Sequence, residues 1–187
     1  MGGRWENRTE IFDGYGQVLV TQSKINPYRI EASDLKGMEQ KDRDLLGISE
    51  KGGYEKIDPG TEIVIVETDL GRMAFPICLD FIDDKIVSIL KETWANLIFV
   101  PAMSPTGLSR FKDTSKVLGQ SHSAIVLVTN SCWCLQFSRK ALEQRDLYVF
   151  YAPHREFENR INPKLNCGQC SEEHICLSLF EINKLTT

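Results

Sequence analysis

Apolar runs alternate with polar segments along the chain, and their spacing predicts several short strands. In EIFDGYGQVLVTQSK, β-forming residues flank a Gly-rich turn, which predicts two strands with the second ending near Lys24. The runs TEIVIVETD and GRMAFPIC are also rich in β-formers and are joined through a glycine. They predict a hairpin that ends at Cys78.

The apolar period changes after Cys78, where residues recur at helical spacing. The positions that carry this period are Ile82, Ile86, Ile89, Leu90 and Trp94. Asp80, Asp83 and Asp84 come early enough to cap the helix and to oppose its positive N-terminal end. A strand, a sharp turn and a helix are therefore expected here, with Cys78 at the turn.

The next segments continue the alternation. ANLIFVPA and AIVLVTN read as strands, FKDTSKVLGQSHS between them reads as a helix, and DLYVFYAP and ICLSLFEI can serve as the last strands. Strands that alternate with helices indicate an α/β layered fold, in which functional sites gather at strand ends. Residues 31–60 are polar and turn-rich, so we expect a surface excursion that could help shape a site entrance.

Composition narrows the classes of function. The chain has 187 residues, of which 42% are hydrophobic, and this suits one compact domain. A formal net charge of −4 without long charge blocks gives no footprint for nucleic acid or an anionic membrane, and a small neutral ligand fits better. Without an apolar run long enough to span a bilayer or a signal-peptide core, we expect a cytoplasmic protein. In that compartment the six cysteines are expected to be thiols, metal ligands or a nucleophile rather than disulfides.

Over about residues 3–130 the order of these motifs resembles one enzyme family. GRMAFPICLDF, ANLIFVPA and AIVLVTN, preceded by GQVLVTQSKINPYRIE, are similar to the C-terminal two-thirds of the carbon–nitrogen hydrolase (nitrilase) domain. The resemblance implies a partial αββα sandwich that lacks its first strands and helix. It places Lys24 and Cys78 on the family's catalytic lysine and cysteine, and Glu31 near the glutamate that assists the lysine.

The chemistry of these residues agrees with the resemblance. An amide or nitrile carbon needs a strong nucleophile, but a free thiol has a pKa of about 8.5 and is mostly protonated at neutral pH. A helix N-terminus after Cys78 and the Lys24 ammonium would both favour the thiolate. Lys24 and the backbone N–H of Leu79 could then stabilise the oxyanion, the roles that the family assigns to them.

Each of these residues also has a structural interpretation. A strand-end cysteine is most often a small buried hydrophobe, and a lone lysine is most often solvated. For Asp80 a helix cap is the more common role than catalysis. His122 lies at a helix end, where a lone histidine is more often structural, and we place it outside the site.

The C-terminal part departs from the family pattern. We divide the chain into a nitrilase-like domain over residues 1–155 and a Cys-rich tail with a final strand over residues 156–187. The tail offers four soft ligands, and these are Cys167, Cys170, His174 and Cys176. They predict a structural zinc site, with buried or exposed thiols as the alternative. Cys132 and Cys134 flank a tryptophan and are expected to pack in the core.

The sequence favours amide hydrolysis through an acyl-enzyme at Cys78, without a cofactor for catalysis. Nitrile hydrolysis and acyl transfer share that intermediate. A catalytically incomplete nitrilase-like assembly or regulatory domain, and an interaction module organised by zinc, remain open. Neither Glu6 nor Glu10 matches the position of the family's general-base glutamate. We therefore expect a portion of a longer protein, or a truncated homologue that is inactive alone and buries an open edge against another chain, as in a homo-oligomer.

Overall fold

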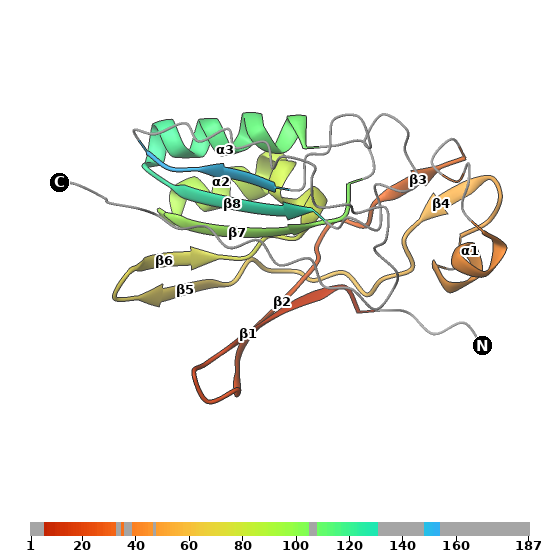
Figure 1. Ribbon diagram of the computed structural model, residues 1–187, viewed down its shortest axis with the longest axis horizontal. Helices are drawn as coiled ribbons and strands as arrows, with labels where there is room; N and C mark the ends of the chain where they lie inside the picture. Colours follow the sequence, from red (N-terminus) through yellow and green to blue (C-terminus); the bar gives the residue numbers. More distant parts are fainter. Residues whose placement is uncertain are drawn as a thin grey trace, which may run out of the picture.

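A five-stranded mixed sheet forms the centre of the molecule (Figure 1). The computed structural model describes residues 6–32, 35, 39–46, 48–104, 108–130 and 148–153. The sheet has the order β5-β6-β7-β8-β9, with antiparallel outer pairs and parallel inner pairs. Its strands are β5 (Ile65–Thr68), β6 (Gly71–Ala74), β7 (Leu97–Ala102), β8 (Ile125–Asn130) and β9 (Tyr148–Tyr151). The predicted alternation of strands and helices is confirmed, and the fold is α/β.

The helices α2 (Asp84–Glu92) and α3 (Ser109–His122) lie against one face of this sheet (Figure 1). A 3-10 turn, η1 (Cys78–Ile82), leads from β6 into α2. The cap of α2 is Asp83, whose side chain accepts hydrogen bonds from two backbone N–H groups of the first turn. The expectation that Asp80 serves as this cap is wrong, because Asp80 lies inside η1 and its carboxylate accepts hydrogen bonds from the backbone of Ile25 and Asn26.

One apolar core lies between the sheet and the two helices. Phe81 of η1, Leu90 of α2 and Leu118 of α3 are fully buried against alternate residues of β7 and β8. Only part of the apolar face predicted for α2 is buried in the core: Ile86 and Leu90 are buried, whereas Ile89 and Trp94 are exposed. The helix ends before Trp94, so that residue no longer follows the helical period.

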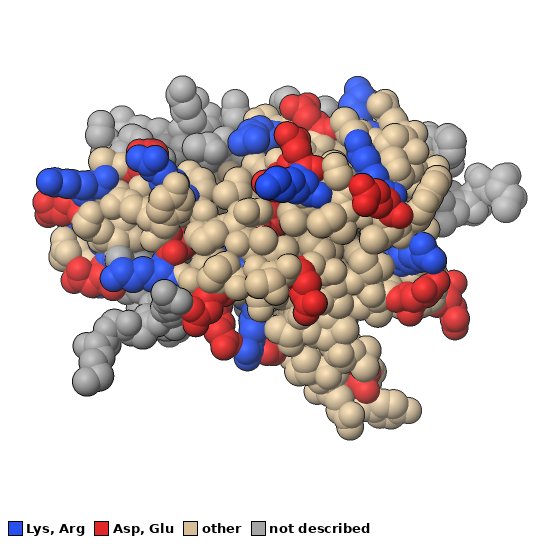
Figure 2. All heavy atoms as spheres, turned by 180° about the vertical axis from the view of Figure 1, so that it is seen from behind, with Lys and Arg blue, Asp and Glu red and all other residues tan. Residues whose placement is uncertain are grey.

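Two small antiparallel sheets precede the large one. β1 (Arg8–Phe12) pairs with β2 (Val18–Ser23), as the sequence predicts, and the hairpin projects from the body (Figure 1). On the face seen in Figure 2, its projecting part is mostly uncharged. β3 (Arg29–Glu31) pairs with β4 (Gly52–Tyr54), and α1 (Gln40–Leu46) lies between them in sequence. The excursion over residues 31–60 therefore has structure of its own, built on a small cluster around Ile30.

The described strands and helices form part of the expected αββα arrangement. They supply one helical layer, the five-stranded sheet and the two small sheets. The boundary at residue 155 and the tail beyond it lie outside the described residues. None of the helices in the described part of the chain is long and apolar enough to cross a membrane.

Candidate active site around Cys78 and Lys24

Cys78 occupies a sharp turn at the start of η1. β6 ends at Ala74, three buried residues follow, and the turn closes with a hydrogen bond from the Asp80 N–H to the Ile77 carbonyl at 3.1 Å. Cys78 itself has φ of 50°, a left-handed conformation that costs most L-residues free energy. The backbone thus turns sharply at the thiol, and the side chain is half-buried against the core.

Opposing influences set the pKa of the Cys78 thiol. Burial raises this pKa most, and the negative charge of Glu55 raises it as well. The backbone N–H of Met103, the positive charge of Lys24 and the backbone N–H of Leu79 lower it. The net effect is an increase above the ordinary value. The expected helpers, Lys24 and Leu79, therefore act in the predicted direction, but burial outweighs them and the resting thiol stays protonated at neutral pH.

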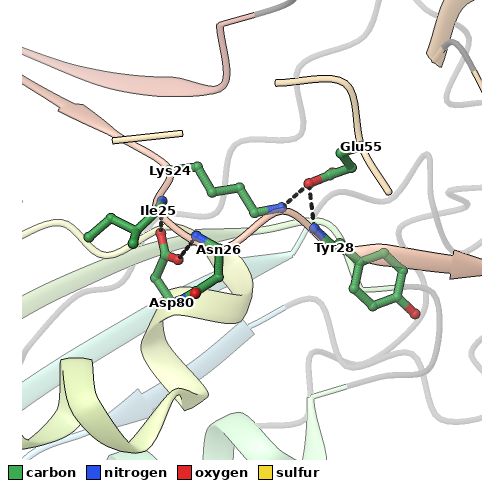
Figure 3. Close-up of polar contacts among 6 residues, drawn as sticks. All are labelled: Lys24, Ile25, Asn26, Tyr28, Glu55 and Asp80. Atoms are coloured by element: carbon green, nitrogen blue, oxygen red, sulfur yellow. Dashed lines mark hydrogen bonds and ion pairs between the residues drawn. The ribbon is translucent and has the colours of Figure 1, made fainter. Parts of the chain in front are cut away.

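Lys24 is a buried charge rather than a solvated one. Its side chain is 2% exposed, and its ammonium forms an ion pair with the carboxylate of Glu55 (Figure 3). The same oxygen of Glu55 also accepts the backbone N–H of Tyr28 at 2.9 Å. The main chain of Lys24 is held as well, because its N–H donates to Asn7 and its carbonyl accepts from Gly60, both at 2.8 Å.

The structure gives Glu31 an exposed position and a partner other than Lys24. It is exposed on β3 and forms an ion pair with Arg29 at 3.0 Å. Ile30 between them faces the small buried cluster, so the alternation of the strand turns Glu31 toward solvent. Glu55, which the sequence interpretation missed, takes the place beside the lysine. Because Glu55 is far from Lys24 in the sequence, no local pattern predicts this contact.

Asp80 joins the Cys78 turn to the segment after Lys24. Its carboxylate is fully buried and accepts the backbone N–H groups of Ile25 at 3.0 Å and Asn26 at 2.7 Å (Figure 3). Burial raises the pKa of this carboxyl, whereas these two N–H groups and the charge of Lys24 lower it. Asp80 thus connects the η1 turn to the backbone that follows Lys24, although the two segments are far apart in the sequence.

The remaining candidates lie elsewhere. His122 contacts Ser121 and packs its ring against Trp94 at the end of α3, and Glu6 and Glu10 both pair with Arg8 at the hairpin. Cys132, Cys134 and the predicted zinc ligands Cys167, Cys170, His174 and Cys176 lie outside the described residues. Within the described ranges, no group of three or more His, Cys, Asp or Glu side chains could hold a metal ion. The zinc site therefore stays a prediction from the sequence.

The arrangement suits thiol chemistry. A half-buried thiol lies at a sharp turn, an ammonium is held by a carboxylate close enough for both charges to act on the sulfur, and two backbone N–H groups act on the same atom. Donors fixed in this way stabilise negative charge that develops during a reaction.

No protein-family model and no curated protein matches the sequence. Among solved structures, the fold is similar to Nit3 of Saccharomyces cerevisiae, described as a member of branch 10 of the nitrilase superfamily, with 14% identity and a TM-score of 0.47 over 68% of this chain and 39% of that one. It is also similar to the C. elegans NitFhit protein, with 20% identity and a TM-score of 0.48 over 67% of this chain and 28% of that one.

A third similar structure is a cysteine-to-alanine mutant of the Nesterenkonia AN1 amidase of the nitrilase superfamily. Its identity is 16% and its TM-score 0.43, over 66% of this chain and 40% of that one. The chain therefore spans less than half of the length of these three structures. The superfamily that the sequence resembles is also represented among the solved structures to which the fold is similar.

Proposed function

We propose that the chain is the part of a nitrilase-type hydrolase that carries the nucleophile, and that it cleaves a non-peptide C–N bond through an acyl-enzyme at Cys78. The observation that carries the proposal is the buried Lys24–Glu55 ion pair, whose charges both act on the Cys78 thiol. A charged lysine is rarely buried without a specific task or partner, and here its charge acts on a candidate nucleophile.

The proposed reaction has two steps. The Cys78 sulfur attacks the amide carbon, the C–N bond breaks, and the thiol proton leaves with the nitrogen as ammonia or an amine. Water then attacks the thioester, which releases a carboxylic acid and restores the thiol. Nitrile hydrolysis and transfer of the acyl group to an amine would use the same covalent intermediate.

Lys24 and the N–H of Leu79 would stabilise the oxyanion of each step. Glu55 would hold the lysine in place, the role that the sequence interpretation gave to Glu31. Its Oε2 already accepts from both the Lys24 ammonium and the Tyr28 N–H. Since burial also keeps the thiol protonated, full activity requires a further base to take the Cys78 proton.

That requirement favours a second candidate, a catalytically incomplete assembly or regulatory domain. In this case the thiol, the lysine and the glutamate are retained but no base reaches the sulfur. The two candidates differ in turnover but share the reactive Cys78.

The test measures ammonia release from short aliphatic amides, together with intact mass and peptide mapping for an acyl group on Cys78. Cys78→Ala should abolish both signals, and Lys24→Met should lower the rate by about 10²-fold or more, as loss of an oxyanion donor does. Lys56→Met, at an exposed lysine of a neighbouring segment, is the control that should leave the rate unchanged.

If the chain releases no ammonia, alkylation by limiting iodoacetamide still measures the reactivity of Cys78. Because burial raises the pKa of Cys78, its rate of alkylation should keep rising at pH values where an ordinary thiol has levelled off. Labelling of Cys78 without ammonia release would support the incomplete domain. Ammonia release that survives in Cys78→Ala would refute the nucleophile assignment.

A further inference from the structure

Asp80 is a buried carboxylate whose two hydrogen bonds reach across the fold. It lies two residues after Cys78 within η1 and is fully buried. Its oxygens accept the N–H groups of Ile25 and Asn26, the two residues that directly follow Lys24. A buried ionised carboxylate costs free energy unless it is hydrogen-bonded, so both bonds are needed to keep it there.

Asp83 gives a matched comparison in the same segment. Its carboxylate also accepts two backbone N–H groups, but these belong to Lys85 and Ile86 at the start of its own helix. Asp83 therefore stabilises a local turn, whereas Asp80 connects the turn of the thiol to the segment of the lysine. The two aspartates share their chemistry and differ in what they join.

The segment of Lys24 is held by one apolar contact next to the lysine and by several polar bonds, since Ile25 is partly buried against the main core. β2 is mostly exposed, and its one buried residue is Gln22, whose amide bonds to the backbone of Glu62 and Val64. Beyond β2 the ion pair with Glu55 holds the tip of the lysine, and Asp80 holds the chain just after it (Figure 3). Polar bonds, together with the packing of Ile25 against the core, thus set where the ammonium lies.

We propose that Asp80 is a positioning residue that fixes the Lys24 ammonium relative to the Cys78 sulfur by fastening the backbone of Ile25 and Asn26 to the η1 turn. This inference rests on the proposed function in taking Cys78 as the nucleophile and Lys24 as its electrostatic partner. It adds that the partnership is maintained through Asp80 and not by the lysine side chain alone.

The direction in which the alkylation rate of Cys78 changes distinguishes a positioning role from an electrostatic or a structural one. Removing a negative charge near Cys78 would, by electrostatics alone, lower the pKa of the thiol and speed its alkylation. Displacing Lys24 would raise that pKa and slow alkylation. A purely structural role would lower the melting temperature and leave the reactivity of Cys78 in the folded protein unchanged.

The experiment compares the full chain with Asp80→Asn, Asp83→Asn and Lys24→Met. The rate of iodoacetamide alkylation at Cys78 is followed by peptide mapping across a pH series, below each variant's melting temperature. Positioning predicts that Asp80→Asn slows alkylation at pH 7 by about three- to tenfold, where a tenfold change corresponds to one unit in the thiol pKa. Asp83→Asn should match the parent protein. An unchanged or faster rate in Asp80→Asn overturns the inference.

A double variant then tests whether Asp80 acts through the lysine. On the Lys24→Met background, Asp80→Asn should produce no further slowing, because the group that it positions is gone. An additive effect would show that Asp80 acts on Cys78 by another route and would overturn the inference.

Two further results separate this inference from the proposed function. If Lys24→Met leaves the alkylation rate unchanged, the proposed electrostatic partnership fails. If Lys24→Met slows alkylation but Asp80→Asn does not, only the positioning role fails.

Should Asp80→Asn not fold, hydrogen exchange of the parent chain still provides a test. The amide protons of Ile25 and Asn26 should be protected like those of β7, and exchange at the rate of an open loop would refute the connection.

Discussion

The large sheet and the β1–β2 hairpin are both made of short strands, but they are held in different ways. In the sheet, alternate residues of β7 and β8 enter one apolar core with α2 and α3. In the hairpin, Phe12, Val18 and Leu19 are largely exposed and the buried residue of β2 is a glutamine. The sheet is stabilised by burial of apolar area, whereas the hairpin is joined to it by hydrogen bonds at its base.

The candidate site combines the two kinds of element. Cys78 comes from the turn attached to the sheet, and Lys24 comes from the end of the hairpin. The thiol is therefore placed by core packing, and the ammonium mainly by polar bonds, with Ile25 as the neighbouring contact to the core. Substitutions in the two regions should accordingly affect different properties, namely stability in the first and reactivity in the second.

The largest effect is expected from Leu118→Ala in α3. Leu118 is fully buried, and its truncation removes apolar contacts and leaves a cavity, so the free energy of unfolding should fall by about 2–5 kcal/mol. Val117 on the same helix is 45% exposed, and Val117→Ala should change stability by less than about 0.5 kcal/mol. Urea denaturation checks both values. Equal effects would contradict a core confined to one face of α3.

A smaller loss is expected from Gly119→Ala, at the contact between α3 and β9. A Cβ placed on Gly119 would lie 1.9 Å from a ring carbon of Tyr151, so the Tyr151 ring, the strand or the helix would have to shift. Overpacking of this kind costs about 1–3 kcal/mol. Combined with Tyr151→Leu, the same change should cost less than the sum of the two single effects in a thermal or urea titration. A stabilised Gly119→Ala chain would contradict this packing.

The smallest effect is expected in the hairpin. Leu19→Ser and Tyr15→Ser change residues that are 59% and 93% exposed, so each should alter the free energy of unfolding by less than about 0.5 kcal/mol. The alkylation rate of Cys78 should also stay unchanged, because the hydrogen bonds of Gln22 and the ion pair of Lys24 at the base of the hairpin involve neither residue. A loss above about 1.5 kcal/mol would mean that another chain covers this apolar surface in solution.

The sequence predicted those parts of the fold that depend on local pattern. The alternation of strand and helix after Cys78 followed from the change of period, and the two hairpins followed from β-formers around glycine turns. The cap of α2 was among the three aspartates considered, but the sequence did not distinguish Asp83 from Asp80. That distinction depends on where the distant Ile25 and Asn26 lie.

For the candidate site, the family resemblance points to Lys24 and Cys78, and the structure adds Glu55 through a tertiary contact. The resemblance points to Glu31 through its spacing from Lys24, whereas the burial of Ile30 in the structure turns Glu31 toward solvent. Glu55 lies in a polar stretch without a distinguishing pattern, and only the pairing of β3 with β4 brings it near the lysine. The raised pKa of Cys78 likewise follows from burial, which the sequence does not quantify.

The division of the site between two regions also makes the chain suited to fragment complementation. Lys24 and Glu55 precede the exposed Lys56, and Cys78 follows it, so a cut after Lys56 would leave the ammonium on one fragment and the thiol on the other. The hydrogen bonds from Val64 to Gln22, from Gly60 to Lys24 and from Ile25 to Asp80 all cross that cut. Reassociation of the two fragments would therefore be reported by the reactivity of one sulfur atom.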